Sequence, residues 1–132
     1  MKITVDTNVL IRAVVRDDKK QAEAAARLLR SAETIAVTLP CLCEFVWVLR
    51  RLYGFERQDA AHAIEALVNA GNVQVNRPAV DAGLAILNAG GDFADAVIAH
   101  EGKWLGGDTF VSFDAKAVSV LAKLGVHTRL LR

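Results

Sequence analysis

The sequence has 132 residues, of which 53% are apolar, and its formal net charge is +1. This length predicts one domain, covering residues 1–132, with a single core, and the near-neutral charge argues against a uniformly basic coat for nucleic acid. The longest charge-free stretches, such as residues 66–76, are shorter than the roughly 18–20 apolar residues of a membrane span, and the amino terminus lacks a signal pattern, so we expect a cytoplasmic protein with no membrane partner.

Short β-rich stretches alternate with longer helical patterns along the whole chain. Helices are predicted over residues 7–15, 19–32, 41–53, 56–70, 77–88, 92–104 and 115–124, and strands over residues 3–5, 34–38, 73–75, 109–113 and 126–130. Strands that are separated by helices need crossover connections, and they therefore form a mainly parallel sheet. The pattern predicts the α/β class, with four to five strands in the central sheet.

The first predicted strand is buried and ends on three polar residues, Asp6, Thr7 and Asn8. In open α/β sheets ligands bind at this carboxyl edge, although Thr7 or Asn8 can also cap the helix that follows. Further along, Cys41 and Cys43 lie one residue apart in an apolar helix. A structural zinc site needs about four ligands, so both thiols are expected to be packing residues.

Further carboxylates lie where later elements begin or end. Asp92 and Asp95 open a helix and, being three apart, lie on the same side of it. Asp114 follows the strand over residues 109–113. Each has a structural alternative, since acids stabilise the positive end of a helix dipole and an aspartate often serves as an N-cap.

Glu44 lies inside the apolar helix, and its nearest basic residues, Arg50 and Arg51, are six and seven positions away. A buried, unpaired carboxylate is costly, so we expect Glu44 to be buried and to pair with a bound cation or another group. Asp6 at the end of its strand raises the same problem. Mg²⁺ and Mn²⁺ relieve repulsion between converging carboxylates, and such sites commonly hydrolyse phosphate esters. The acids leave phosphodiester and phosphomonoester hydrolysis open.

Four motifs, in this order and spacing, resemble the PIN domain family. They are Val5-Asp6-Thr7-Asn8-Val9-Leu10, Glu44 in its apolar helix, the stretch from Asp92 to Ala99, and Ser112-Phe113-Asp114. The resemblance covers essentially the whole chain, and the subgroup to which it is most similar is the VapC-type toxins of bacterial toxin–antitoxin pairs.

The resemblance implies a three-layer α/β/α sandwich and a metal-dependent endoribonuclease. The catalytic acids would be Asp6, Glu44, Asp95 and Asp114, with Asp6 and Asp95 as the principal Mg²⁺ or Mn²⁺ ligands and Glu44 and Asp114 as direct or water-mediated ones. Thr7, Asn8, Asp92 and Ser112 would support the site. The family also implies a homodimer, and a small antitoxin that covers apolar helices and blocks the acidic pocket.

Two further patterns fit an RNA-cleaving toxin. Basic residues follow the first two strands and are candidates to bind RNA phosphates, namely Arg12, Arg16, Lys19, Lys20, Arg50, Arg51 and Arg57. A set of apolar residues is expected to be exposed beyond the needs of a monomer, namely Leu42, Trp47, Val48, Leu52 and Tyr53. Since aromatic residues make up only 6% of the chain, contacts to RNA shape and backbone are expected to dominate over base stacking.

Three alternatives compete with the nuclease. A metal-dependent phosphatase of the haloacid-dehalogenase type would need a second Asp where this chain has Asn8, together with a positioned late lysine that is not evident. A receiver-like signalling domain would need paired acids near the first strand and a positioned late lysine, and neither is evident in this chain. A PIN-fold RNA-binding module without cleavage would have no use for four mutually repelling carboxylates.

Overall fold

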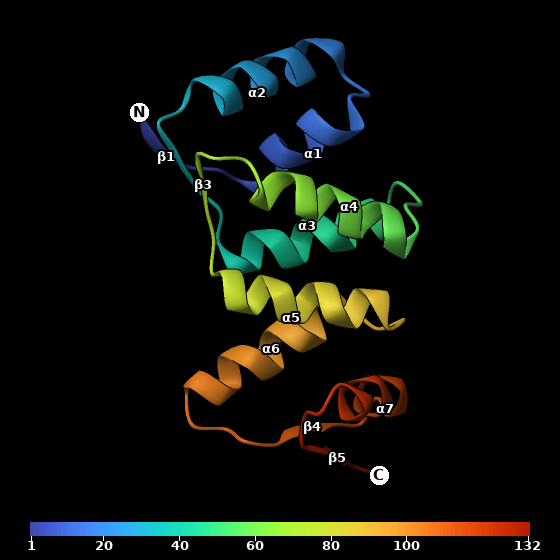
Figure 1. The fold of residues 1–132 in the computed structure, drawn as a ribbon. Coiled ribbons are helices and arrows are strands. Elements are labelled where there is room, and N and C mark those ends of the chain that lie inside the picture. Colours follow the sequence, from blue (N-terminus) through green and yellow to red (C-terminus); the bar gives the residue numbers. More distant parts are fainter. The chain divides into compact units, whose positions relative to one another are not determined.

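The computed structural model, which describes residues 1–132, contains seven helices and five strands, with one or two helices between successive strands (Figure 1). They belong to two compact units, Met1–Asn76 and Arg77–Arg132. No helix has both the length and the apolar character required to cross a membrane.

The first unit contains a parallel three-stranded sheet and four helices. Its elements are β1 (Lys2–Thr4), α1 (Thr7–Val15), α2 (Lys19–Ser31), β2 (Thr34–Ala36), α3 (Leu39–Arg51), α4 (Arg57–Val68) and β3 (Val73–Gln74). The strand order is β1-β2-β3, and Ile35 in the central strand is paired with Ile3 on one side and Val73 on the other. The carboxyl ends of β1 and β2 therefore lie at the same edge, and the chain enters α1 and α3 there.

Side-chain caps set the starts of α1 and α3. Asp6, and not the predicted Thr7 or Asn8, is the N-cap of α1, and its side chain accepts a hydrogen bond from the Thr7 backbone N–H. Thr38 caps α3, which begins at Leu39, two residues earlier than predicted. Pro40 is compatible with this earlier start because the first helical turn does not need its missing N–H. Both caps bring the following side chains close to the sheet edge.

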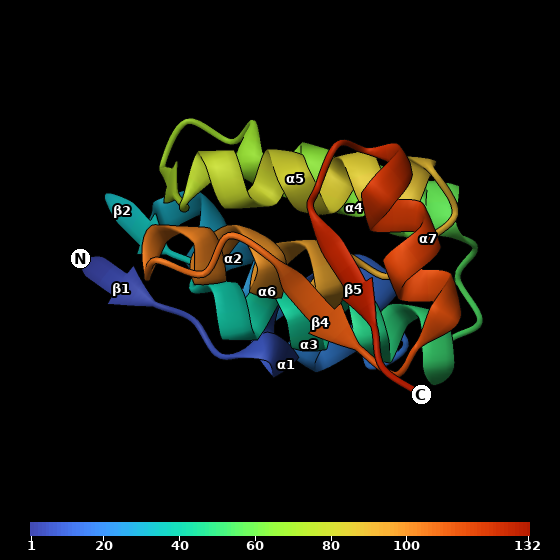
Figure 2. The same ribbon diagram turned by 90° about the horizontal axis from the view of Figure 1, so that it is seen from below.

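The second unit has three helices and a parallel pair of strands. Its elements are α5 (Arg77–Asn88), α6 (Phe93–Trp104), β4 (Phe110–Ser112), α7 (Ala115–Lys123) and β5 (Thr128–Leu130). Figure 2 shows β4 and β5 as neighbouring arrows beside α7. A buried cluster of Ile86, Ala96, Val120 and Leu121 joins the three helices.

Close packing between α5 and α6 depends on a glycine. A Cβ atom at Gly83 would overlap the ring of Phe93, which is fully buried at the start of α6. Gly90 then has a φ of +92°, a backbone conformation that favours glycine, in the turn between the two helices. Gly90 and Gly91 thus form a tight, specific turn that places Asp92 at the beginning of α6.

The predicted α/β class with parallel strands is confirmed. Four of the five strands are shorter than predicted: for example, β2 ends at Ala36 and not at residue 38, and β4 covers three residues and not five. β1 has its predicted length and begins one residue earlier. They form one sheet of three strands and one of two. That residues 1–132 act as a single domain stays a prediction.

Candidate functional site

Asp6 presents a carboxylate at the carboxyl end of β1. Its Oδ1 accepts the Thr7 backbone N–H at 2.7 Å, which orients the side chain, while Oδ2 makes no hydrogen bond. The side chain is exposed. Asp6 can therefore cap α1 and still offer an oxygen to a ligand.

Glu44 is exposed, so the prediction that its carboxylate is buried is wrong. The buried stripe of α3 consists of Leu39, Cys41, Leu42, Phe45, Val46 and Leu49. Glu44 lies at the edge of this stripe and reaches solvent, and burial alone therefore does not require it to have a counter-ion. The case for Glu44 as a metal ligand therefore depends on the residues that lie near it.

The thiol of Cys41 shows how near Asp6 and Glu44 lie to each other. Burial is the main cause that raises the pKa of Cys41, and the Asp6 and Glu44 carboxylates both raise it further. The Thr7 hydroxyl donates a hydrogen bond to Cys41 Sγ at 3.7 Å and opposes this shift. The structure thus brings Asp6 and Glu44 around one buried thiol, although they are far apart in the sequence.

Three aspartates and a serine form the acidic group of the second unit. Asp92 caps α6, and its Oδ1 accepts the Ala94 backbone N–H at 3.4 Å. Asp114 caps α7 by accepting the Ala117 N–H at 3.1 Å. Ser112 Oγ in turn accepts the Asp114 backbone N–H at 2.9 Å, which holds the turn between β4 and α7. Both structural alternatives from the sequence, the helix-start acid and the N-cap, are therefore present.

Asp95 is the half-buried aspartate of this group. Burial is the largest cause that raises its pKa above the ordinary value of 3.8, and the Asp92 and Asp114 carboxylates raise it further. No basic group contributes to this shift. The capping roles of Asp92 and Asp114 therefore leave an uncompensated negative field at Asp95, which a cation would relieve.

The donor set fits a hard divalent cation in its chemistry. No three His, Cys, Asp or Glu side chains lie close enough together to enclose a metal ion by themselves. Mg²⁺ does not need such a cage, because it usually keeps several waters and binds through one or two carboxylates. Asp6 and Glu44 in the first unit, and Asp95 with Asp114 in the second, are pairs of this type. The acidic groups thus fit Mg²⁺ or Mn²⁺ held partly through water.

The arginines predicted to bind phosphates differ in their availability. Arg12 is bonded to Gln21 Oε1 at 2.6 Å and to Asp17 Oδ1 at 3.3 Å. Arg50 donates to the Phe55 carbonyl at 3.2 Å. Arg16 and Arg51, by contrast, are exposed and make no ion pair. Those two side chains are the free cations among these four arginines.

The residues predicted to support the site differ in their burial and in their hydrogen bonds. Thr7 is 4% exposed, and its hydroxyl is bonded to Cys41. Ser112 is bonded to Asp114. Asn8 is exposed and makes no side-chain hydrogen bond. The hydrogen bond between Thr7 and Cys41 was not predicted from the sequence, which indicated only a packing role for Cys41. The one feature of the sequence that links Cys41 to the site is its position three residues before Glu44.

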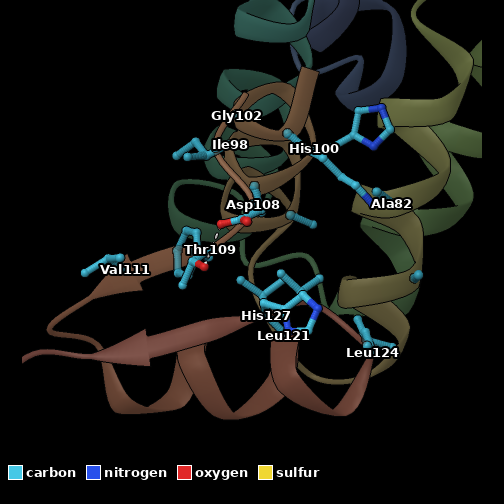
Figure 3. A pocket seen from close by; sticks show the side chains of 18 residues that line it. Ala82, Ile98, His100, Gly102, Asp108, Thr109, Val111, Leu121, Leu124 and His127 are labelled. Carbon is cyan, nitrogen blue, oxygen red and sulfur yellow. Dashed lines mark hydrogen bonds between the residues drawn. The ribbon is translucent and has the colours of Figure 1, made fainter. Parts of the chain in front are cut away.

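A cavity of about 590 Å³ lies in the second unit, and Asp92, Asp95 and Asp114 are not among the residues that line it (Figure 3). Its lining includes Asp108 and Thr109, which precede β4, and His127, which precedes β5. Asp114 follows the opposite, carboxyl end of β4. Because β4 and β5 are parallel, the cavity and the acidic group lie at opposite ends of the strand pair, and the cavity is not part of the acidic site.

Comparison with known proteins supports the resemblance found in the sequence. The family model described as PIN domain matches residues 3–123. A search of curated proteins found no match. The family match includes all four acidic motifs and nearly the full chain. The protein therefore belongs to the PIN domain family.

Proposed function

We propose that this protein is a Mg²⁺- or Mn²⁺-dependent endoribonuclease that acts as the toxin of a toxin–antitoxin pair. PIN domains are generally metal-dependent nucleases, which makes nuclease activity the expectation for the family as a whole. The observation that carries the proposal here is the uncompensated acidic field at Asp95. Burial is the largest cause that raises the pKa of Asp95, the Asp92 and Asp114 carboxylates raise it further, and no basic group opposes them.

The acidic residues have distinct roles in this proposal. Asp6 and Asp95 are the principal metal ligands, and Glu44 and Asp114 bind directly or through water. A bound Mg²⁺ or Mn²⁺ would polarise a phosphodiester and help to form a nucleophile from water. Thr7, Asn8, Asp92 and Ser112 support the ligands; for Ser112 the supporting observation is its hydrogen bond with the Asp114 N–H.

The RNA substrate would be held through its phosphates. Arg16 and Arg51 are the best candidates for this contact, since neither is engaged with a protein acceptor. Arg12 and Arg50 would first have to leave the partners to which they are bonded. Each phosphate contact that is lost should weaken RNA binding and reduce its dependence on salt.

A small antitoxin and a second copy of the chain are the proposed protein partners, in the cytoplasm. The supporting observation is apolar surface on α3 and directly after it, where Trp47 is 54% and Leu52 is 67% exposed. Leu42, which was predicted to belong to this surface, is instead completely buried. The surface therefore rests on fewer residues than predicted.

Cleavage of labelled, structured RNAs tests this function. We expect products with Mn²⁺ or Mg²⁺, none with EDTA, and a loss of at least about 100-fold in Asp6→Asn and Asp95→Asn. The matched control is Asp108→Asn, an exposed aspartate that precedes β4, which should cleave like the wild type.

Other outcomes would support the competing functions. RNA binding without cleavage at any metal concentration would favour the RNA-binding module. Release of phosphate from a small phosphomonoester, with RNA left intact, would favour the phosphatase. Equal cleavage by wild type and Asp6→Asn would mean a contaminating nuclease and would contradict the proposal.

A further inference from the structure

The hydroxyl of Thr7 is a buried polar group that is bonded to a distant part of the chain. Thr7 is 4% exposed and is the one fully buried polar residue in the structure. Its Oγ1 donates to Cys41 Sγ at 3.7 Å, across 34 positions of sequence. The bond joins the first residue of α1 to the first turn of α3.

Each end of this bond lies next to a candidate metal ligand. Thr7 directly follows Asp6, and its backbone N–H is bonded to Asp6 Oδ1 at 2.7 Å. Cys41 and Glu44 are three apart in α3, so they share one side of that helix. The Cys41 N–H is itself bonded to the Thr38 hydroxyl at 3.3 Å. Cys41 is therefore held on its backbone by the α3 cap and on its thiol by Thr7.

We infer that the Thr7–Cys41 pair is a positioning device that sets the separation of the Asp6 and Glu44 carboxylates for a divalent cation. Neither residue touches the ion; both act by fixing the turn after β1 against the first turn of α3. The inference rests on the proposed metal-dependent function. It gives Cys41 a role beyond packing, since a thiol at this position accepts a hydrogen bond that an aliphatic side chain would not.

Direct measurement of Mn²⁺ binding tests the inference without relying on activity. Free Mn²⁺ has an electron paramagnetic resonance signal that is lost on binding, so a titration yields the Kd. Thr7→Val replaces the hydroxyl with a methyl group of similar size, and Cys41→Ala removes the acceptor. We expect each to weaken Mn²⁺ binding by about tenfold, as is common when a group that orients a metal ligand is removed.

Two further variants separate positioning from simple packing. Thr7→Ser keeps the hydroxyl and should recover Mn²⁺ binding to within about threefold of the wild type. The double variant Thr7→Val with Cys41→Ala should bind no more weakly than the weaker single variant, because both remove the same hydrogen bond. Cys43→Ala, at the other cysteine of α3, is the matched control and should bind like the wild type.

The outcomes distinguish this inference from the function on which it rests. If the wild type binds Mn²⁺ and cleaves RNA but Thr7→Val binds equally well, the pair has no positioning role and the nuclease stands. A lowered Tm with unchanged Mn²⁺ affinity, or losses that multiply in the double variant, also contradicts positioning. If the wild type takes up no more Mn²⁺ than Asp6→Asn, the metal-dependent function fails and the positioning role fails with it.

Discussion

At the scale of single residues, the local field at Asp95 is the clearest electrostatic feature of this protein. Burial first, and then the Asp92 and Asp114 carboxylates, raise its pKa above the unfolded value. Between those two pKa values the folded protein binds more protons than the unfolded chain. Protonated Asp95 therefore stabilises the folded protein at low pH relative to high pH. This contribution to the free energy of unfolding is lost as the pH rises through the folded-state pKa, and a bound divalent cation would restore it.

The first prediction concerns Asp95→Asn without divalent cations. At pH 7 the substitution removes an unfavourable charge, so we expect the Tm to rise by about 1–3 °C, a small figure because the side chain is partly exposed. At about pH 3 the Asp95 carboxyl of the wild type is protonated, and the difference in Tm between variant and wild type should disappear. Thermal unfolding followed by circular dichroism at both pH values measures this, and a lower Tm of the variant at pH 7 would contradict it.

The second prediction concerns Glu44, which the structure places in solvent. Because Glu44 is exposed, Glu44→Gln should leave the Tm unchanged to within about 1 °C. If the residue binds the cation directly or through water, metal-dependent RNA cleavage should still fall by about 10–100-fold. Unchanged cleavage at all Mn²⁺ concentrations would remove Glu44 from the site. Glu33→Gln, at an exposed glutamate just before β2, is the matched control.

At the scale of the elements, the acids are held by the ends of helices and strands. Asp6, Asp92 and Asp114 are all N-caps, so the sequence features that start α1, α6 and α7 also place acidic residues of the candidate site. In the second unit this arrangement depends on how closely α5 approaches α6. Gly83 permits that approach, because its missing side chain leaves room for the Phe93 ring at the start of α6.

The third prediction tests this helix contact. Gly83→Ala should destabilise the protein by about 1–3 kcal/mol, since the added methyl group meets a buried ring that cannot move freely. Gly102→Ala is the matched control: Gly102 is also helical, and a Cβ atom there meets nothing within 4 Å. It should stabilise the protein by about 0.5–1 kcal/mol. Urea denaturation measures both, and equal effects would contradict the close contact.

Much at this scale was predictable from local patterns. Helical periodicity and caps placed all seven helices to within a few residues, and α5 was predicted with its observed bounds. The strand ends were less accurate, because hydrogen-bonded pairing between strands depends on a neighbouring strand and not on β-branched composition alone. The same holds for the start of α1: the sequence predicted Thr7 or Asn8 as the cap, and the backbone at the helix start selects Asp6.

At the scale of the whole molecule, the acidic residues should couple metal binding to stability. A cation that binds only the folded chain stabilises it, by about 2.7 kcal/mol at one hundred times its Kd. No basic group compensates the field at Asp95, so the folded protein would gain from a bound cation. The same residues that repel one another without metal would then stabilise the protein with it.

The fourth prediction follows from this coupling. The wild-type Tm should rise with Mn²⁺ concentration, and Asp6→Asn and Asp95→Asn should each show a much smaller rise. Differential scanning fluorimetry across a Mn²⁺ series measures the effect. Asp108→Asn should respond like the wild type. A rise of equal size in all four proteins would indicate nonspecific binding of the cation.

The sequence by itself determined the α/β class, the parallel strands, the order of the helices and the acidic motifs of the PIN domain family. These depend on local periodicity, on caps and on motif spacing, which a linear chain records directly. Tertiary structure decided the exposure of Glu44, the burial of Leu42, the surroundings of Asp95 and the Thr7–Cys41 hydrogen bond. Each of these depends on which distant segments pack together, and residue order alone does not record that.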